Sequence, residues 1–151
     1  MRSEKFFYKS PIGLLEIIYE NNSIVLLKFA DVITASDTNT YFPEKIKTQL
    51  DEYFMGKRKS FDIKINPKGT EFQKKVWQEL SKIPFGKTKS YSDIAKKIGQ
   101  PNAWRAVGSA CNKNPVMIII PCHRVISKSG NLAGYAYGTE LKARLLEFER
   151  S

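Results

Sequence analysis

The sequence predicts an α+β protein of two modules, a small sheet with a helix over residues 1–66 and a helical module over residues 67–151. Apolar residues alternate or form short β-rich runs in the first half, whereas they recur at helical spacing in the second. The segment Asn66-Pro67-Lys68-Gly69 has the composition of a linker. Charge divides at the same place: residues 1–66 carry 10 basic and 9 acidic side chains, net +1, and residues 67–151 carry 15 and 6, net +9.

The composition is that of a globular protein with enough apolar mass for a core, because 42% of the 151 residues are hydrophobic and 26% are charged. No apolar run approaches the roughly 20 residues needed to span a bilayer, and the first residues lack the apolar segment of a signal peptide. We therefore expect a cytoplasmic protein that is not attached to a membrane. With two cysteines and one histidine, the chain is expected to hold neither a disulfide framework nor a structural zinc ion.

The first module is expected to contain strands, a loop and one helix. The expected strands are Lys5–Lys9, Leu14–Tyr19, Ile24–Phe29 and Phe61–Ile65, with a hairpin turn at Glu20–Ser23. The polar residues Asp31–Thr40 are expected to form a loop. A helix is expected to begin at Pro43 and end at Gly56, with an apolar stripe of Ile46, Leu50, Tyr53 and Phe54.

The second module is expected to be a series of short helices. Capping boxes at Thr70–Gln73 and Ser90–Asp93 predict two helix starts, and Asn102 is expected to cap a further helix that runs to about Asn112. Two helices joined by a short turn on a basic background are typical of a helix-turn-helix. Val116–Ile120 is expected to be a buried strand or extended segment. Thr139 is expected to cap the last helix.

The net charge of +10 and the pI near 9.6 favour a polyanionic partner for the basic half. Charge alone does not separate nucleic acid from an anionic membrane, and a lysine-rich proteome is the alternative explanation.

The pentapeptide Pro121-Cys-His-Arg-Val125 carries the most chemical information, because the chain's one histidine directly follows a cysteine. A cysteine is nucleophilic as the thiolate, so it needs a nearby base or positive charge. His123 is a candidate base, and Arg124 adds positive potential. Neighbours in an extended chain point to opposite faces, so a direct contact between Cys122 and His123 requires a turn, and otherwise a water must bridge them. A buried cysteine beside a surface histidine is an equally good interpretation of the spacing alone.

The motifs between residues 70 and 149 resemble those of the O6-alkylguanine-DNA alkyltransferases, also called methylated-DNA–protein-cysteine methyltransferases. Besides the cysteine pentapeptide, the shared motifs are Phe72-Gln-x-x-Val-Trp77, Ile83-Pro-x-Gly86, Ser90-Tyr91, Arg105-Ala-Val-Gly108, Asn114-Pro115, Gly134-Tyr135, Lys142, Leu145-Leu146 and Glu149. The resemblance implies a ribonuclease-H-like N-terminal module, a winged-helix-like C-terminal module and no cofactor. Residues 1–66 contain neither cysteine nor histidine, so the zinc site of some relatives is absent.

The resemblance implies a single-turnover reaction in which Cys122 takes an alkyl group from O6 of guanine and keeps it as a thioether. His123 would be the base, acting through a water, Glu149 would orient the imidazole, and Asn114 would hold the turn that presents the cysteine. This is the logic of nucleophile, base and orienting carboxylate with a thiol as the nucleophile.

The implied partner is double-stranded DNA that contains O6-alkylguanine, bound by a monomer without sequence preference. The damaged nucleotide must leave the stack, and Arg105 would fill its place. Tyr91 and Tyr135, the carbonyls of Cys122 and Val125 and the amide near Ala136 would contact the base. Small residues around Arg105, among them Ala106 and Ser109, suit close approach in the minor groove.

Three residues depart from the family pattern: Trp104 beside Arg105, Cys111 at a pocket wall, and Tyr137 at the pocket rim. Two other functions compete with alkyl transfer. A non-catalytic alkyltransferase-like protein would bind the damaged base without reacting, although such proteins lack the cysteine. A cysteine hydrolase would turn over repeatedly, but no feature of the sequence indicates a cleft for its substrate.

Overall fold

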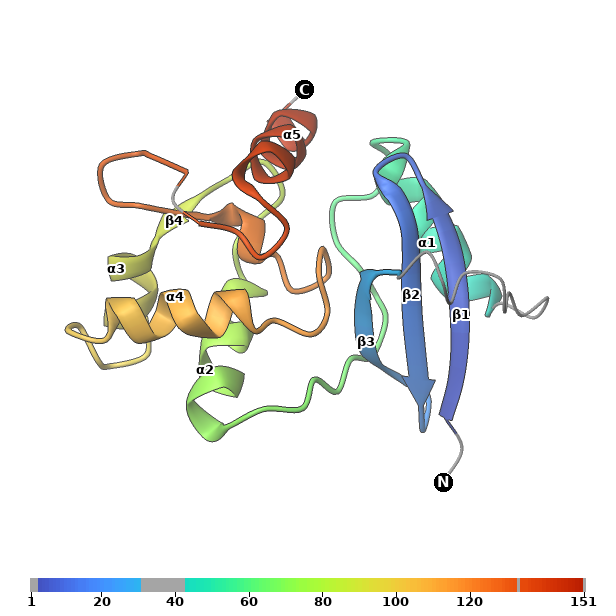
Figure 1. The fold of residues 1–151 in the computed structure, drawn as a ribbon, viewed down its shortest axis with the longest axis horizontal. Coiled ribbons are helices and arrows are strands. Elements are labelled where there is room, and N and C mark those ends of the chain that lie inside the picture. Colours follow the sequence, from blue (N-terminus) through green and yellow to red (C-terminus); the bar gives the residue numbers. More distant parts are fainter. Residues whose placement is uncertain (1–2, 31–42, 133, 151) are drawn as a thin grey trace. The chain divides into compact units, whose positions relative to one another are not determined.

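The computed structural model describes residues 3–30, 43–132 and 134–150. It confirms a mixed α+β protein. The chain forms two compact units, Met1–Lys68 and Gly69–Ser151 (Figure 1). No helix in these described ranges is long and apolar enough to cross a membrane.

The first unit contains a three-stranded antiparallel sheet in the order β1 (Ser3–Ser10), β2 (Gly13–Glu20) and β3 (Ser23–Phe29). The predicted hairpin between β2 and β3 is confirmed. Asn21 and Asn22 form its turn with positive φ angles of 49° and 63°. Tight hairpin turns with two left-handed residues match the twist of the strands, and asparagine tolerates this conformation.

Helix α1 (Glu44–Phe54) belongs to the same unit as the sheet. Three residues of its predicted stripe, Ile46, Leu50 and Tyr53, are buried, and the fourth, Phe54, is half-buried. The Tyr8 hydroxyl of β1 donates to the Asp51 carboxylate of α1 at 2.6 Å, which joins the helix to the sheet. The predicted loop Asp31–Thr40 lies outside the described residues.

The predicted strand Phe61–Ile65 is wrong. Only Ile65 pairs, in a single parallel bridge to Ile24. The Ile24 amide donates to Lys64 O at 2.9 Å and the Asn66 amide donates to Ile24 O at 2.8 Å. The next residue, Pro67, has no amide hydrogen to continue such a ladder.

The second unit is mainly helical. Its elements are α2 (Glu71–Leu80), β4 (Lys89–Ser90), α3 (Tyr91–Lys97), α4 (Trp104–Asn112), the one-turn 3₁₀ helix η2 (Cys122–Arg124), β5 (Val125–Ile126) and α5 (Thr139–Arg150). Both predicted capping boxes are confirmed, at Thr70 and Gln73 for α2 and at Ser90 and Asp93 for α3. Strands β4 and β5 form a short parallel pair.

Two predicted caps are wrong. Asn102 does not cap α4, whose N-cap is Ala103 without a side-chain hydrogen bond, so residues 98–103 join α3 to α4. Thr139 is the first residue of α5 rather than its cap, and the Gly138 carbonyl accepts from the Lys142 amide at 3.2 Å. A left-handed φ of 95° at Gly138 turns the chain into this helix.

The segment Val116–Ile120 is buried as predicted, but it is a turn and not a strand. Its amides bond within the segment, Ile119 to Met117 O at 2.8 Å and Ile120 to Val116 O at 3.0 Å, and Ile118 has a φ of 71°. The side chain of Asn114 bonds to both ends of the segment: its Oδ1 accepts from the Val116 amide at 2.9 Å and its Nδ2 donates to Ile120 O at 2.8 Å. Buried backbone needs hydrogen-bond partners, and here one side chain supplies two of them.

Candidate functional site

Cys122 begins η2 directly after this buried turn, and it is 4% exposed. Asn114 Nδ2 lies 3.2 Å from Cys122 Sγ and donates to it. The same amide nitrogen donates to Ile120 O. Asn114 therefore bonds to both the turn and the sulfur.

His123 is fully buried, and its Nε2 lies 2.8 Å from Oε2 of Glu149 on α5. Arg124 contacts the same carboxylate twice: its Nε lies 2.8 Å from Oε1 and its Nη2 lies 3.1 Å from Oε2. Arg124 Nη1 also donates to the Ile83 carbonyl at 2.7 Å. The 3₁₀ turn thus directs two consecutive side chains onto one carboxylate.

The charge of Arg124 is satisfied by Glu149, so the sequence-based assignment of Arg124 as a source of positive potential for the cysteine is corrected. A carboxylate held by a guanidinium remains an acceptor, so Nε2 of His123 donates the hydrogen to it. The free electron pair of the imidazole is then on Nδ1. This atom is buried and has no hydrogen-bond partner among the described residues.

Burial lowers the pKa of His123, although the hydrogen bond and negative charge of Glu149 oppose the shift. The imidazole is therefore neutral, which is the form that accepts a proton. Burial raises the pKa of the Cys122 thiol, while the hydrogen bond from Asn114 and the positive charge of Lys142 act in the opposite direction. The sulfur thus needs a proton acceptor to become a thiolate.

Lys142 is fully buried on α5, and its Nζ donates to Leu132 O at 2.5 Å, to Gly134 O at 3.1 Å and to the Tyr91 hydroxyl at 3.4 Å. Sequence reasoning noted Lys142 only as part of a motif. A signal for it exists, because Lys142, Leu145, Leu146 and Glu149 share the spacing of one helix face, and all four are buried. Charged residues on a buried face indicate a specific role.

Tyr91, Tyr135 and Tyr137 lie near the Cys122 thiol. Burial, with the two cysteines nearby, raises the pKa of Tyr91 to about 12. Tyr135 has a buried hydroxyl that lacks a partner in the described part of the chain, and its ring packs edge-on against Tyr137 with the centroids 5.7 Å apart. The buried thiol of Cys111 also belongs here, since its pKa is raised by burial and by Cys122.

Of the residues predicted to contact DNA, those on α4 and Ala136 are exposed, whereas Val125 is buried. Arg105, Ala106 and Ser109 are exposed on α4, whereas Val107, Ala110 and Cys111 form its buried face. Ala136 is exposed. Val125 is buried in β5, and its amide bonds to the Cys122 carbonyl.

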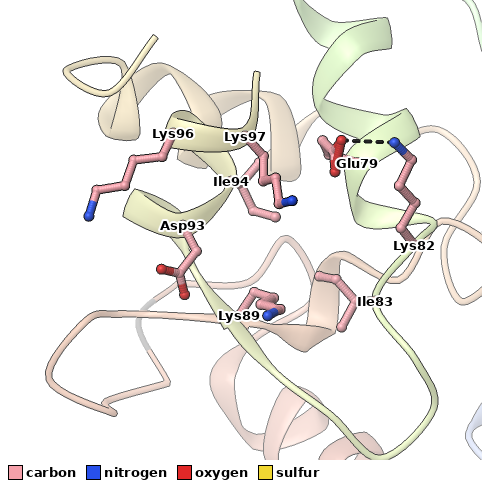
Figure 2. A pocket seen from close by; sticks show the side chains of 8 residues that line it. All are labelled: Glu79, Lys82, Ile83, Lys89, Asp93, Ile94, Lys96 and Lys97. Carbon is pink, nitrogen blue, oxygen red and sulfur yellow. Dashed lines mark hydrogen bonds and ion pairs between the residues drawn. The ribbon is translucent and has the colours of Figure 1, made fainter. Parts of the chain in front are cut away.

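A separate hollow of about 570 Å³ lies between α2 and α3 (Figure 2). Four lysines line it, and one of them, Lys82, pairs with Glu79 at 3.0 Å. Figure 2 shows this pair. The other three are Lys89, Lys96 and Lys97. Its lining contains none of the residues predicted for catalysis or for DNA contact, although it includes Ile83, whose carbonyl accepts from Arg124.

Comparison with known proteins agrees with the sequence resemblance along the chain. The family described as "6-O-methylguanine DNA methyltransferase, DNA binding domain" matches residues 71–151, and its "ribonuclease-like domain" matches residues 5–67. A methylated-DNA–protein-cysteine methyltransferase of Methanosarcina acetivorans is 45% identical over 95% of this chain and 96% of its own length.

Solved structures agree as well. The O6-methylguanine methyltransferase of Mycobacterium tuberculosis is similar with a TM-score of 0.87 and 38% identity, over 99% of this chain and 93% of that one. A complex of the M. tuberculosis protein OGT with DNA gives a TM-score of 0.86 and 40% identity, over 97% and 92% of the two chains. Because family, sequence and structure agree over both units, the chain belongs to the methylated-DNA–protein-cysteine methyltransferase family.

Proposed function

We propose that this protein repairs O6-alkylguanine in double-stranded DNA by moving the alkyl group to Sγ of Cys122, once per molecule. The observation that carries the proposal is the pairing of a buried, neutral His123 with Glu149 directly beside a buried cysteine. That arrangement leaves one imidazole nitrogen able to accept a proton from the thiol. It lies in the unit whose family is described as DNA binding.

In the proposed reaction, Nδ1 of His123 takes the thiol proton of Cys122 through a bridging water. The thiolate attacks the alkyl carbon, the sulfur–carbon bond forms as the carbon–O6 bond breaks, and the bonding electrons pass to guanine, which regains a proton. Glu149 fixes the imidazole tautomer, and Arg124 holds Glu149 in place. The thioether has no group that would release the alkyl carbon, so the protein is consumed.

The target atom is inside the duplex, so the nucleotide must be flipped out before reaction. We assign Arg105 to the space that the base leaves, and Tyr91, Tyr135 and the backbone at Cys122, Val125 and Ala136 to contacts with the flipped guanine. The exposed small residues Ala106 and Ser109 permit close approach of α4 to the minor groove. Binding is expected to be independent of sequence and to involve a monomer.

The cytoplasm is the expected compartment, because Cys122 must stay reduced to react.

The proposal is tested by incubating the protein with duplex DNA that contains one O6-methylguanine and analysing its peptides by mass spectrometry. The peptide with Cys122 should gain the mass of one CH2 group, with one methyl per protein molecule. The same duplex with unmodified guanine is the control. A protein that binds the damaged duplex but gains no mass would be a non-catalytic damage-binding protein, and repeated turnover would contradict the single-use mechanism.

A further inference from the structure

Trp104 is the first residue of α4, and it is 46% exposed. Among the described residues, the large hydrophobic side chains that are exposed are Trp104 and Met55. The core does not need Trp104, because Val107, Ala110 and Cys111 form the buried face of α4. The other tryptophan, Trp77, is 2% exposed and donates its indole N–H to Ala110 O at 2.9 Å. Trp104 is thus an exposed apolar side chain that does not belong to the core.

The next residue, Arg105, contacts the exposed ring of Trp104. The guanidinium carbon of Arg105 lies 4.9 Å from the centroid of the Trp104 ring, within the range of a cation–π contact. No ion pair to Arg105 is present within the described ranges. An exposed ring beside an exposed cation suits nucleic acid, because bases stack on aromatic faces and the negative charge of the strand attracts the cation.

We propose that Trp104 is a base-stacking residue for DNA in which a nucleotide has left the stack. On binding, Arg105 leaves the indole ring to enter the duplex, and the freed ring packs against a nucleobase beside the opened position. Apolar wedges of this kind hold kinked minor grooves open in other DNA-binding proteins. The inference rests on the proposed binding of DNA by α4, but it does not depend on alkyl transfer to Cys122.

Fluorescence tests this directly because the chain has two tryptophans and Trp77 is shielded in the core. Titration with a duplex containing O6-methylguanine should quench the emission of Trp104, measured with Cys122→Ser so that no reaction follows. The variant Trp104→Phe keeps a stacking ring but leaves only Trp77 to emit. It should bind with nearly unchanged affinity and lose the quenching. Equal quenching in Trp104→Phe would overturn the proposal.

Affinity provides the second measurement. Because stacking of one base contributes about 1–3 kcal/mol and each 1.4 kcal/mol is tenfold in affinity, Trp104→Ala should weaken binding of the damaged duplex by roughly 5- to 150-fold. Met55→Ala, the matched control at the other exposed apolar side chain, should change nothing. Thermal unfolding of each variant excludes misfolding as the cause. Unchanged affinity in Trp104→Ala would refute the assignment.

Alkyl transfer distinguishes this proposal from the proposed function. At saturating DNA and long times, Trp104→Ala should still transfer one methyl group per molecule. Quenching of Trp104 without methylation of Cys122 in the unaltered protein would contradict the proposed function and leave the stacking role intact. Methylation without quenching would do the reverse.

Discussion

Arg124 contacts both carboxylate oxygens of Glu149, across 25 residues of sequence, at 2.8 and 3.1 Å. The side chains of both residues are almost fully buried. Glu149 has a further partner, since its Oε2 is also 2.8 Å from His123 Nε2. The imidazole is consequently oriented by a carboxylate that is itself held in place.

Arg124→Ala should lower the free energy of unfolding of the second unit by about 3–5 kcal/mol. The reason is that the buried carboxylate of Glu149 loses the guanidinium that compensates its charge. Urea denaturation measures the loss. Lys82→Ala is the control in the same unit: Lys82 pairs with Glu79 at 3.0 Å, and its side chain is largely exposed. Such exposed pairs contribute about 0–1 kcal/mol. Similar losses in the two variants would show that the buried pair is not special.

Glu149→Gln should shift the pH dependence of alkyl transfer. The negative charge and hydrogen bond of Glu149 raise the pKa of His123, against the lowering by burial, so their removal lowers that pKa further. Because the neutral imidazole is the base, the acidic limb of the rate profile should move to lower pH. The plateau rate should also fall, since the amide no longer selects the tautomer. An unshifted acidic limb would mean that His123 is not the group that titrates.

Cys122→Ser should abolish alkyl transfer while DNA binding persists, because a hydroxyl is far less acidic than a thiol. Cys111→Ser is the matched variant, since both thiols are buried, 4% exposed for Cys122 and 5% for Cys111. It should keep most of the activity. Transfer is measured by the mass of the peptides. Loss of transfer in both variants, or in Cys111→Ser alone, would reassign the nucleophile.

Arg105→Ala should slow repair of duplex DNA by about ten- to a thousandfold, since unstacking a base costs a few kcal/mol and each 1.4 kcal/mol is about tenfold in rate. Free O6-benzylguanine needs no flipping, so its reaction should change by about two- to threefold on the same scale, provided that it enters past Tyr137. His123→Ala should slow both substrates. The second-order rate constants decide: equal slowing of both substrates by Arg105→Ala would place Arg105 in the fold or the pocket.

DNA affinity should fall steeply as salt rises and depend little on sequence. Residues 67–151 carry 15 basic and 6 acidic side chains, net +9, and each phosphate contact releases counterions on binding. The measurement is the binding constant between about 50 and 200 mM salt. A constant that stays flat over this range would argue against a phosphate-dominated interface.

Features that depend on neighbouring residues followed from the sequence. The hairpin at Asn21-Asn22 and the capping boxes at Thr70 and Ser90 each involve a few consecutive residues, so their geometry is encoded locally. The motif at Cys122 and His123 was equally visible, because it belongs to five consecutive residues.

Tertiary structure decided which hydrogen-bond and charge partners the buried residues have. Val116–Ile120 has the composition of a buried strand and is largely buried, but its amides bond within the segment and to Asn114, which makes it a turn. Apolar composition reports burial and not the partner of the backbone. In the same way, sequence placed Arg124 beside the thiol, whereas the fold pairs it with Glu149 and buries Lys142 against Tyr91. A buried charge takes the partner that the packing of distant segments brings within reach, and local sequence does not contain that information.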